Sequence, residues 1–234
     1  MNPKPTHPRI AVADHPAGQT NGIADAQALA VLRNTYRLLA MTLAFSAVVA
    51  GISAALRLPH PGLLLTLGGY FGLLFLTSHL RNSAWGLLAV FALTGFMGYT
   101  LGPLLAAYLS LPNGSQMIMA ALGTTAAVFV GLSWYAGRED AIDMMRFGNF
   151  LVIGILTAFC LGLAAYFLAM PALAAAVSAM FVLLMSGLIL YQTQAILRGG
   201  ERNYITATVT LYVALYNLFA SLLQMFGLLS GDDA

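Results

Sequence analysis

Charged residues are scarce in this chain, and acidic ones are absent from its long apolar stretches. Only 8% of the 234 residues are charged, whereas 60% are hydrophobic and the mean hydropathy is +0.83. A soluble domain carries about 25% charged residues, so the composition indicates a polytopic membrane protein. All 8 Asp and Glu residues lie in predicted tails or loops. Because ion pathways are usually marked by buried ionisable groups, the predicted membrane region offers no candidate carrier site.

Cysteine is also nearly absent, since Cys160 is the only one and lies in an apolar stretch. An intramolecular disulfide is excluded, and a cysteine-based metal site is implausible. No cluster has metal-ligand spacing, and no glycine-rich loop is placed to cradle a phosphate. Ser133, in GLSWYAG, could pair as a nucleophile only with a histidine in a tail or at a span end, such as His79. We therefore predict no catalytic residue, no cofactor and no metal, and a protein that is not an enzyme.

Long apolar stretches, by contrast, fill most of the chain. A bilayer core takes about 20 helical residues, and seven segments are long enough. We place them at 35 to 56, 62 to 80, 85 to 109, 117 to 136, 147 to 169, 172 to 197 and 203 to 229. Short connections, several with proline, join neighbouring segments. The sequence predicts an all-α polytopic membrane protein whose seven transmembrane helices form one domain over residues 31 to 229.

Arginines fall almost entirely on one side of the predicted membrane. These are Arg33, Arg37, Arg81, Arg138, Arg146, Arg198 and Arg202. The other side has only Arg57, so the positive-inside rule predicts a cytoplasmic N-terminus and a periplasmic C-terminus. Residues 1 to 30, with several prolines, are predicted to be a disordered cytoplasmic tail, either passive or a flexible handle for a partner. Residues 230 to 234 are predicted to be a short acidic periplasmic tail. The basic residues are scattered between spans, so no nucleic-acid partner is predicted.

The seventh segment carries a patterned face of small and polar residues. Its members, at alternating spacings of 4 and 3, are Asn203, Ala207, Thr210, Ala214, Asn217, Ser221 and Gln224. On a helix they form one stripe, which suits close packing and interhelical hydrogen bonds better than contact with lipid. This pattern predicts a central position for the seventh helix. Whether the stripe has a chemical role or only a packing role stays open.

The third segment contains three glycines on one helical face, Gly95, Gly98 and Gly102, followed by Pro103. Bare backbone on one face predicts close contact with another helix. Pro103 deprives the carbonyl group near Tyr99 of its usual helical donor and can kink the helix. Packing is one interpretation of this motif, and a gating hinge is the other.

Three stretches together resemble a known family. They are VLRNTYRLLAMTLAFSA at 31 to 47, TGFMGYTLGPLL at 94 to 105 and GGERNYITATVTLYVALYNLFASLLQ at 199 to 224. From about Val31 to the acidic tail, the chain resembles the Bax inhibitor family and, within it, the bacterial YccA-like branch. The resemblance implies a central seventh helix wrapped by the other six. It also implies an inner-membrane protein that binds and modulates the FtsH protease with HflK and HflC, slowing the turnover of membrane proteins.

Other members of that family are calcium leak channels, and they use a pair of aspartates in the sixth and seventh helices. Here the matching positions hold Gln192 and Ala214, neither of which can titrate. A pH-operated carboxyl pair is therefore unavailable. The alternative function that remains is a constitutive leak of calcium or another cation along Asn203, Thr210, Asn217 and Gln192. Gln192 lies about 9 Å inside the predicted boundary, so we expect its side chain to find a hydrogen-bond partner.

Overall fold

The computed structural model describes the backbone of residues 17–231 and the side chains of residues 26–228. Within that range the elements are helices: α1 (Ala17–Ala55), α2 (Leu63–Leu80), α3 (Trp85–Leu109), α4 (Gly114–Ala136), the 3-10 turn η1 (Met144–Phe147), α5 (Gly148–Phe167), α6 (Pro171–Leu197) and α7 (Tyr204–Gly231). Seven helices in the described residues are long and apolar enough to cross a membrane. The all-α, seven-span prediction is confirmed.

The start of α1 corrects the predicted boundary of the N-terminal tail. We expected disorder over residues 1 to 30, but the helix begins at Ala17, so that expectation is wrong from Ala17 onward. The reason is local: no proline follows Pro16 for forty residues or so, and alanine, glutamine and leucine dominate from Ala24 to Leu32. Residues 1–16 and 232–234 lie outside the described part, so predictions about them stay predictions.

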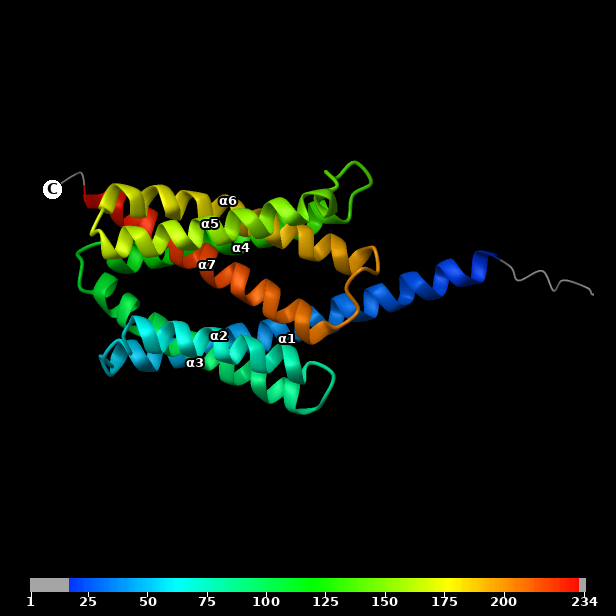
Figure 1. The fold of residues 1–234 in the computed structure, drawn as a ribbon, viewed down its shortest axis with the longest axis horizontal. Coiled ribbons are helices and arrows are strands. Elements are labelled where there is room, and N and C mark those ends of the chain that lie inside the picture. Colours follow the sequence, from blue (N-terminus) through cyan, green and yellow to red (C-terminus); the bar gives the residue numbers. More distant parts are fainter. Residues whose placement is uncertain (1–16, 232–234) are drawn as a thin grey trace, which may run out of the picture.

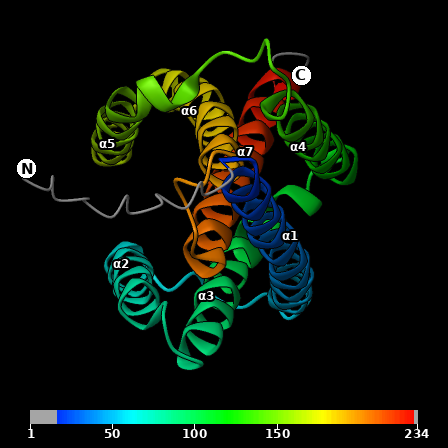
Figure 2. The ribbon, with the colours of Figure 1, turned by 90° about the vertical axis from the view of Figure 1, so that its right-hand side faces the viewer.

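Two groups of three helices enclose α7. Helices α1, α2 and α3 form one group and α4, α5 and α6 the other, and α7 runs diagonally between them (Figure 1). α7 packs directly against α1, α3, α4 and α6, while α2 packs against α3 and α5 against α6. Seen along the bundle, α2 and α5 complete the ring on one side, and α1 and α4 on the other (Figure 2). The central seventh helix is confirmed.

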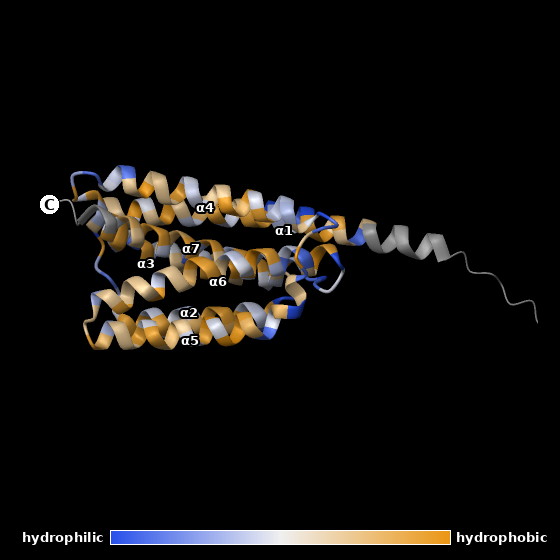
Figure 3. Cartoon of the chain, turned by 90° about the horizontal axis from the view of Figure 1, so that it is seen from above, coloured by the Kyte–Doolittle hydropathy of each residue, from blue (hydrophilic) through white to orange (hydrophobic). Residues whose placement is uncertain are grey.

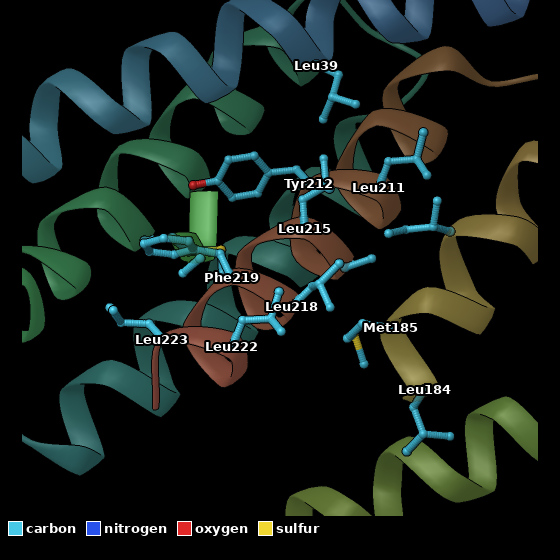
Figure 4. Close-up of a cluster of buried hydrophobic side chains, with 14 of the residues drawn as sticks. Leu39, Leu184, Met185, Leu211, Tyr212, Leu215, Leu218, Phe219, Leu222 and Leu223 are labelled. Carbon is cyan, nitrogen blue, oxygen red and sulfur yellow. The ribbon is translucent and has the colours of Figure 1, made fainter. Parts of the chain in front are cut away.

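The core is built on α7. Large apolar side chains of this helix, among them Leu211, Leu215 and Leu218, are buried with residues of the surrounding helices (Figure 4). Large hydrophobic side chains also cover the outside, as Phe75 and Leu183 do, each 75% exposed. Hydrophilic residues gather at the two ends (Figure 3). This distribution is that of a bundle surrounded by lipid, in which helix association depends on close packing and interhelical hydrogen bonds.

The alternation of the helices places three connections at each end of the bundle. We call the end that holds the α2–α3, α4–α5 and α6–α7 connections the basic end, because Arg81, Arg138, Arg146, Arg198 and Arg202 all lie there. The first half of α1 reaches the same end, and α7 finishes at the other, which we call the opposite end (Figure 1). Arg57 lies at the opposite end. The arginine asymmetry found in the sequence is therefore an asymmetry between the two ends of the fold.

Candidate functional site

The three glycines of α3 face α1 at close range. A Cβ atom on Gly98 would lie 2.5 Å from the backbone oxygen of Ser46, and one on Gly102 would overlap the side chain of Ser53. At Gly95 the nearest atoms belong to the ring of Phe45, at 2.9 Å. Since a backbone oxygen cannot move aside as a flexible side chain can, Gly98 is the least replaceable of the three. The motif thus forms the α1–α3 interface.

Pro103 lies inside α3 and leaves the backbone carbonyl group of Tyr99 without a helical donor. A donor from another helix replaces it. Ser53 Oγ of α1 donates a hydrogen bond to the backbone oxygen of Tyr99, at 3.0 Å. The Tyr99 hydroxyl in turn donates to the backbone oxygen of Pro59, at 2.9 Å, in the α1–α2 connection. The sequence predicted the orphaned carbonyl but not its partner, because Ser53 is distant in sequence and has no motif around it.

Asn203 caps α7 and ties it to a neighbouring connection. Its Oδ1 accepts hydrogen bonds from the backbone nitrogens of Ile205 and Thr206, at 3.0 and 3.2 Å, which is the geometry of an N-cap. Its Nδ2 donates to the backbone oxygen of Arg81 at 3.1 Å and to Asn82 Oδ1 at 2.9 Å. One amide therefore both begins the central helix and fastens the α2–α3 connection to it.

The rest of the α7 stripe is divided between packing and local hydrogen bonds. Ala207 and Ala214 are fully buried, as close packing requires. Thr210 Oγ1 donates to the backbone oxygen of Thr206, and Asn217 Nδ2 to that of Val213, both within α7. Ser178 of α6 donates to Gln224 Oε1 at 2.7 Å, close to the end of the described side chains. The stripe thus supplies one interhelical side-chain hydrogen bond besides those of Asn203.

Near the basic end of α6 the interhelical hydrogen bonds come from Gln194 and not from Gln192. Gln192, the position matched to an aspartate, is buried, and its Nε2 has no hydrogen-bond partner among the described residues, against our expectation. Gln194, two residues on, accepts from the backbone nitrogen of Met144 at 2.9 Å and donates to the backbone oxygen of Ile142 at 2.8 Å. The sequence analysis missed Gln194. The signal that could have identified it is its position, since it is a second glutamine in the last turns of the sixth span, close to a polar connection.

A set of hydroxyl groups at the level of Ala214 was also missed. Ser46 Oγ of α1 and the Tyr212 hydroxyl of α7 lie 2.5 Å apart, and the same hydroxyl donates to the backbone oxygen of Thr94 of α3 at 3.3 Å. One turn along, the hydroxyl groups of Thr100 and Tyr216 lie 3.3 Å apart. Tyr212 is only 1% exposed (Figure 4). These tyrosines join α7 to α1 and α3 without any ionisable carboxylate.

Ion pairs fasten the α4–α5 connection at the basic end. Asp143 pairs with Arg198 of the α6–α7 connection, N to O 2.5 Å, and with Arg146 at 3.2 Å. Desolvation opposes ionisation of Asp143, but the hydrogen bond and charge of Arg198, together with Arg146, outweigh it and lower the pKa of the carboxyl group. Arg138 likewise lowers the pKa of Asp140 through a two-pronged hydrogen bond. With Gln194 and Asn203, these contacts link all three connections of the basic end.

Two of the cavities beside α7 share residues. One, of about 290 Å³, is a cleft between α2 and α5 whose inner wall includes Tyr216. The other, of about 720 Å³, lies towards the opposite end between α3, α5, α6 and α7. Asn217 and Phe181 line both. Asn217 is thus a polar residue at the junction of two cavities, which the sequence pattern did not reveal.

The residues of the predicted leak path are not brought together. Asn203 lies at the basic end, Asn217 lines the two cavities, and Thr210 bonds to its own helix. Among the described residues no hydrogen bond joins any two of these or Gln192. The arrangement therefore supports a tightly packed bundle more than it supports an ion leak.

The structure does not pair Ser133 with His79 either. His79 stacks on Phe75, with ring centroids 6.3 Å apart, and Ser133 Oγ has no hydrogen-bond partner among the described residues.

The chain is similar to proteins of one family over most of its length. Residues 28 to 231 match the family described as "Inhibitor of apoptosis-promoting Bax1". A protein of Escherichia coli strain K12 named "Modulator of FtsH protease YccA" is 51% identical over 202 residues, covering 86% of this chain and 91% of that protein. One of a second Escherichia coli strain, with the same identity and coverage, is named "Inner membrane protein YccA". An uncharacterized protein of Pseudomonas aeruginosa is 55% identical over 203 residues, 87% of this chain and 91% of its own.

Proposed function

The chain belongs to the Bax inhibitor family, and from that premise we propose that it is a multi-pass inner-membrane protein that modulates an FtsH-type protease. One observation carries the proposal: the relative named as a modulator of FtsH is matched at 51% identity over 91% of its length. The family match, over residues 28 to 231, includes all of the seven apolar helices except the first two residues of the first one, together with the connections between them. Both the family and the relative's name point to a regulator and not to a catalyst.

The fastening of the basic end suggests how such a protein acts. Asn203, Gln194 and Asp143 each join segments that are far apart in sequence, so the connections between helices are held against the bundle. α7, which a protease would have to extract, is enclosed by α1, α3, α4 and α6. We propose that the protease engages this chain but removes it slowly, and that other membrane proteins are degraded more slowly meanwhile.

The N-terminal segment is the part that we propose the protease engages. α1 extends beyond the bundle at the basic end (Figure 1). The sequence before it is rich in proline and poor in large apolar residues, which suits a handle for an unfolding enzyme. This role requires the basic end to face the cytoplasm, which the arginine asymmetry favours. HflK and HflC are proposed to join the complex, as the family resemblance implies.

Affinity purification tests the partnership. A tagged copy is purified from native membranes in mild detergent beside a copy lacking residues 2 to 16 and an unrelated seven-span protein. The deletion stops before α1, so the folded bundle is kept whole. The proposal predicts that the full chain recovers FtsH, with HflK and HflC, above the unrelated control. Absence of every protease component, even after crosslinking, would contradict the partnership.

The deletion copy tests the handle separately. If the first 16 residues are what the protease grips, that copy is predicted to have a longer lifetime in cells than the full chain, measured after protein synthesis is stopped. An equal lifetime would contradict the handle and leave the partnership to the purification result.

A further inference from the structure

The two cavities that share Asn217 differ in polarity in a way that matches an amphiphile. The lining of the chamber towards the opposite end includes six polar residues, which are Tyr108, Tyr166, Ser178, Asn217, Ser221 and Gln224. The cleft between α2 and α5 is lined mostly by apolar and aromatic side chains, with Thr66, Tyr70, Thr100, Tyr216 and Asn217 the polar exceptions. Because Asn217 and Phe181 line both, the chamber and the cleft adjoin.

The chamber retains hydrogen-bonding capacity. Among the described residues Asn217 makes one side-chain hydrogen bond, from Nδ2 to its own helix, and Gln224 makes one, through Oε1 to Ser178. The Asn217 oxygen and the Gln224 nitrogen are therefore free to accept and to donate. None of the residues that line the chamber is Asp, Glu, Lys, Arg or His. Such a lining suits a polar group without net charge, since a net charge placed there would lack a counter-ion.

The cleft is too narrow for a helix. Phe71 of α2 and Phe159 of α5 meet edge to face across it, with ring centroids 5.8 Å apart. A helix with its side chains is about 10 Å across, so a partner's transmembrane helix would have to separate the two rings and the helices that carry them. An acyl chain is far thinner and flexible. Phe71 and Leu156, which line the cleft, are 49% and 59% exposed, so the cleft faces the surrounding bilayer.

We propose that the chamber and the cleft together bind one zwitterionic phospholipid, with its head group in the chamber and an acyl chain in the cleft. Asn217 and Gln224 contact the head group, and the aromatic residues of α2 and α5 hold the chain. Lipid would enter from the leaflet at the opposite end, where the chamber lies. This site is independent of any protease partner.

Gly162 offers a substitution that fills the chamber. It lines the chamber on α5, and a Cβ atom there meets only Val177 Cγ1, at an ordinary 3.6 Å, so a side chain can be added without displacing backbone. Gly131 on α4 is the matched control, because it is exposed and a Cβ atom there meets nothing within 4 Å. Gly162→Phe is predicted to block the head group, whereas Gly131→Phe adds the same ring elsewhere on the bundle.

The probe is phosphatidylethanolamine carrying a photoreactive diazirine in mid-chain, reconstituted with the full chain in vesicles. After illumination, labelled residues are mapped by mass spectrometry. Labelling is predicted to concentrate on cleft residues such as Phe159, and to fall about tenfold in Gly162→Phe while staying unchanged in Gly131→Phe. Gln224→Leu is a milder change at an exposed position. It is predicted to reduce the labelling of cleft residues about fivefold, because the hydrogen bond from Gln224 to the head group is lost. Phosphatidylglycerol, which is anionic, is predicted to label the cleft several-fold less.

Two results would overturn the proposal. If labelling were spread evenly over lipid-facing residues and were unchanged in Gly162→Phe and Gln224→Leu, the probe would be contacting the protein only as ordinary bilayer lipid. A photoreactive side chain at position 159 that captures protein in native membranes, and not lipid, would mean that the cleft holds a partner's helix.

Discussion

At the scale of single residues, backbone proximity at Gly98 has the clearest energetic consequence. A methyl group there meets the backbone oxygen of Ser46 at 2.5 Å, so Gly98→Ala forces α1 and α3 apart. We expect it to lower the free energy of unfolding by about 1–3 kcal/mol, as overpacking does. Gly72→Ala, on the exposed face of α2 with nothing within 4 Å, is the control. Unfolding in detergent, followed by fluorescence, measures both; equal stabilities would show that the close contact is absent.

Asn203 allows its two roles to be separated by two substitutions. Asn203→Asp keeps the oxygens that cap α7 but loses the Nδ2 donor to Arg81 and Asn82, whereas Asn203→Ala loses both. We expect faster hydrogen exchange in the α2–α3 connection for both variants. Exchange in the first turn of α7 should rise only in Asn203→Ala, where the lost cap is worth about 1 kcal/mol. Identical exchange maps for the two variants would contradict the division of roles.

The Asp143 carboxyl group makes the basic end sensitive to acid. Its pKa is lowered, despite opposing desolvation, by Arg198 and Arg146. A lowered pKa stabilises the folded state above the ordinary carboxyl pKa, and that contribution is lost as the pH falls through the lowered value, below about pH 4. Hydrogen exchange in the α4–α5 connection should therefore rise below about pH 4. In Asp143→Asn, hydrogen exchange in this connection should already be faster at pH 7 and should change less with pH. If the exchange rate of the wild-type connection did not change on acidification, the prediction would be contradicted.

At the scale of elements, the hydroxyl contacts join α7 to α1 and α3. Tyr212→Phe removes the hydroxyl shared by Ser46 and Thr94, and Ser46→Ala removes one of its partners. Each change is expected to destabilise by about 1 kcal/mol, and the double variant by less than the sum, because the two groups bond to each other. A double-mutant cycle on unfolding in detergent measures the coupling. Strict additivity would mean that the contact contributes nothing.

The sequence predicted elements well and side-chain partners poorly. Helix bounds follow from apolar length, and the glycine spacing of α3 anticipated a close neighbour, because both are local properties of the chain. That Ser53 would supply the donor missing at Tyr99, or Gln194 the tether to Met144, depends on which helices become neighbours. The error at Ala17 arose differently: composition suggested disorder where alanine-rich sequence continues a helix that tertiary contacts stabilise further on.

At the scale of the whole molecule, the fold combines an enclosed central helix with one fastened end. α7 is held by direct contact with four helices, and the connections of the basic end are held by Asn203, Gln194 and the Asp143 ion pair. Neither Gln192 nor Ala214 can titrate, so the predicted behaviour does not depend on a carboxyl pair. A bundle with these two features, in which α1 extends beyond the basic end, is the structural basis of the proposed slow removal by a membrane protease.

The most direct test is the rate at which purified FtsH, in vesicles with ATP, degrades a membrane substrate while this chain is present in the same bilayer. The account predicts that the wild-type chain slows degradation, and that Gly98→Ala, which loosens the bundle, slows it less and is itself degraded faster. The unrelated seven-span protein should have no effect. A substrate degraded at the same rate with and without this chain would contradict the proposed modulation of the protease.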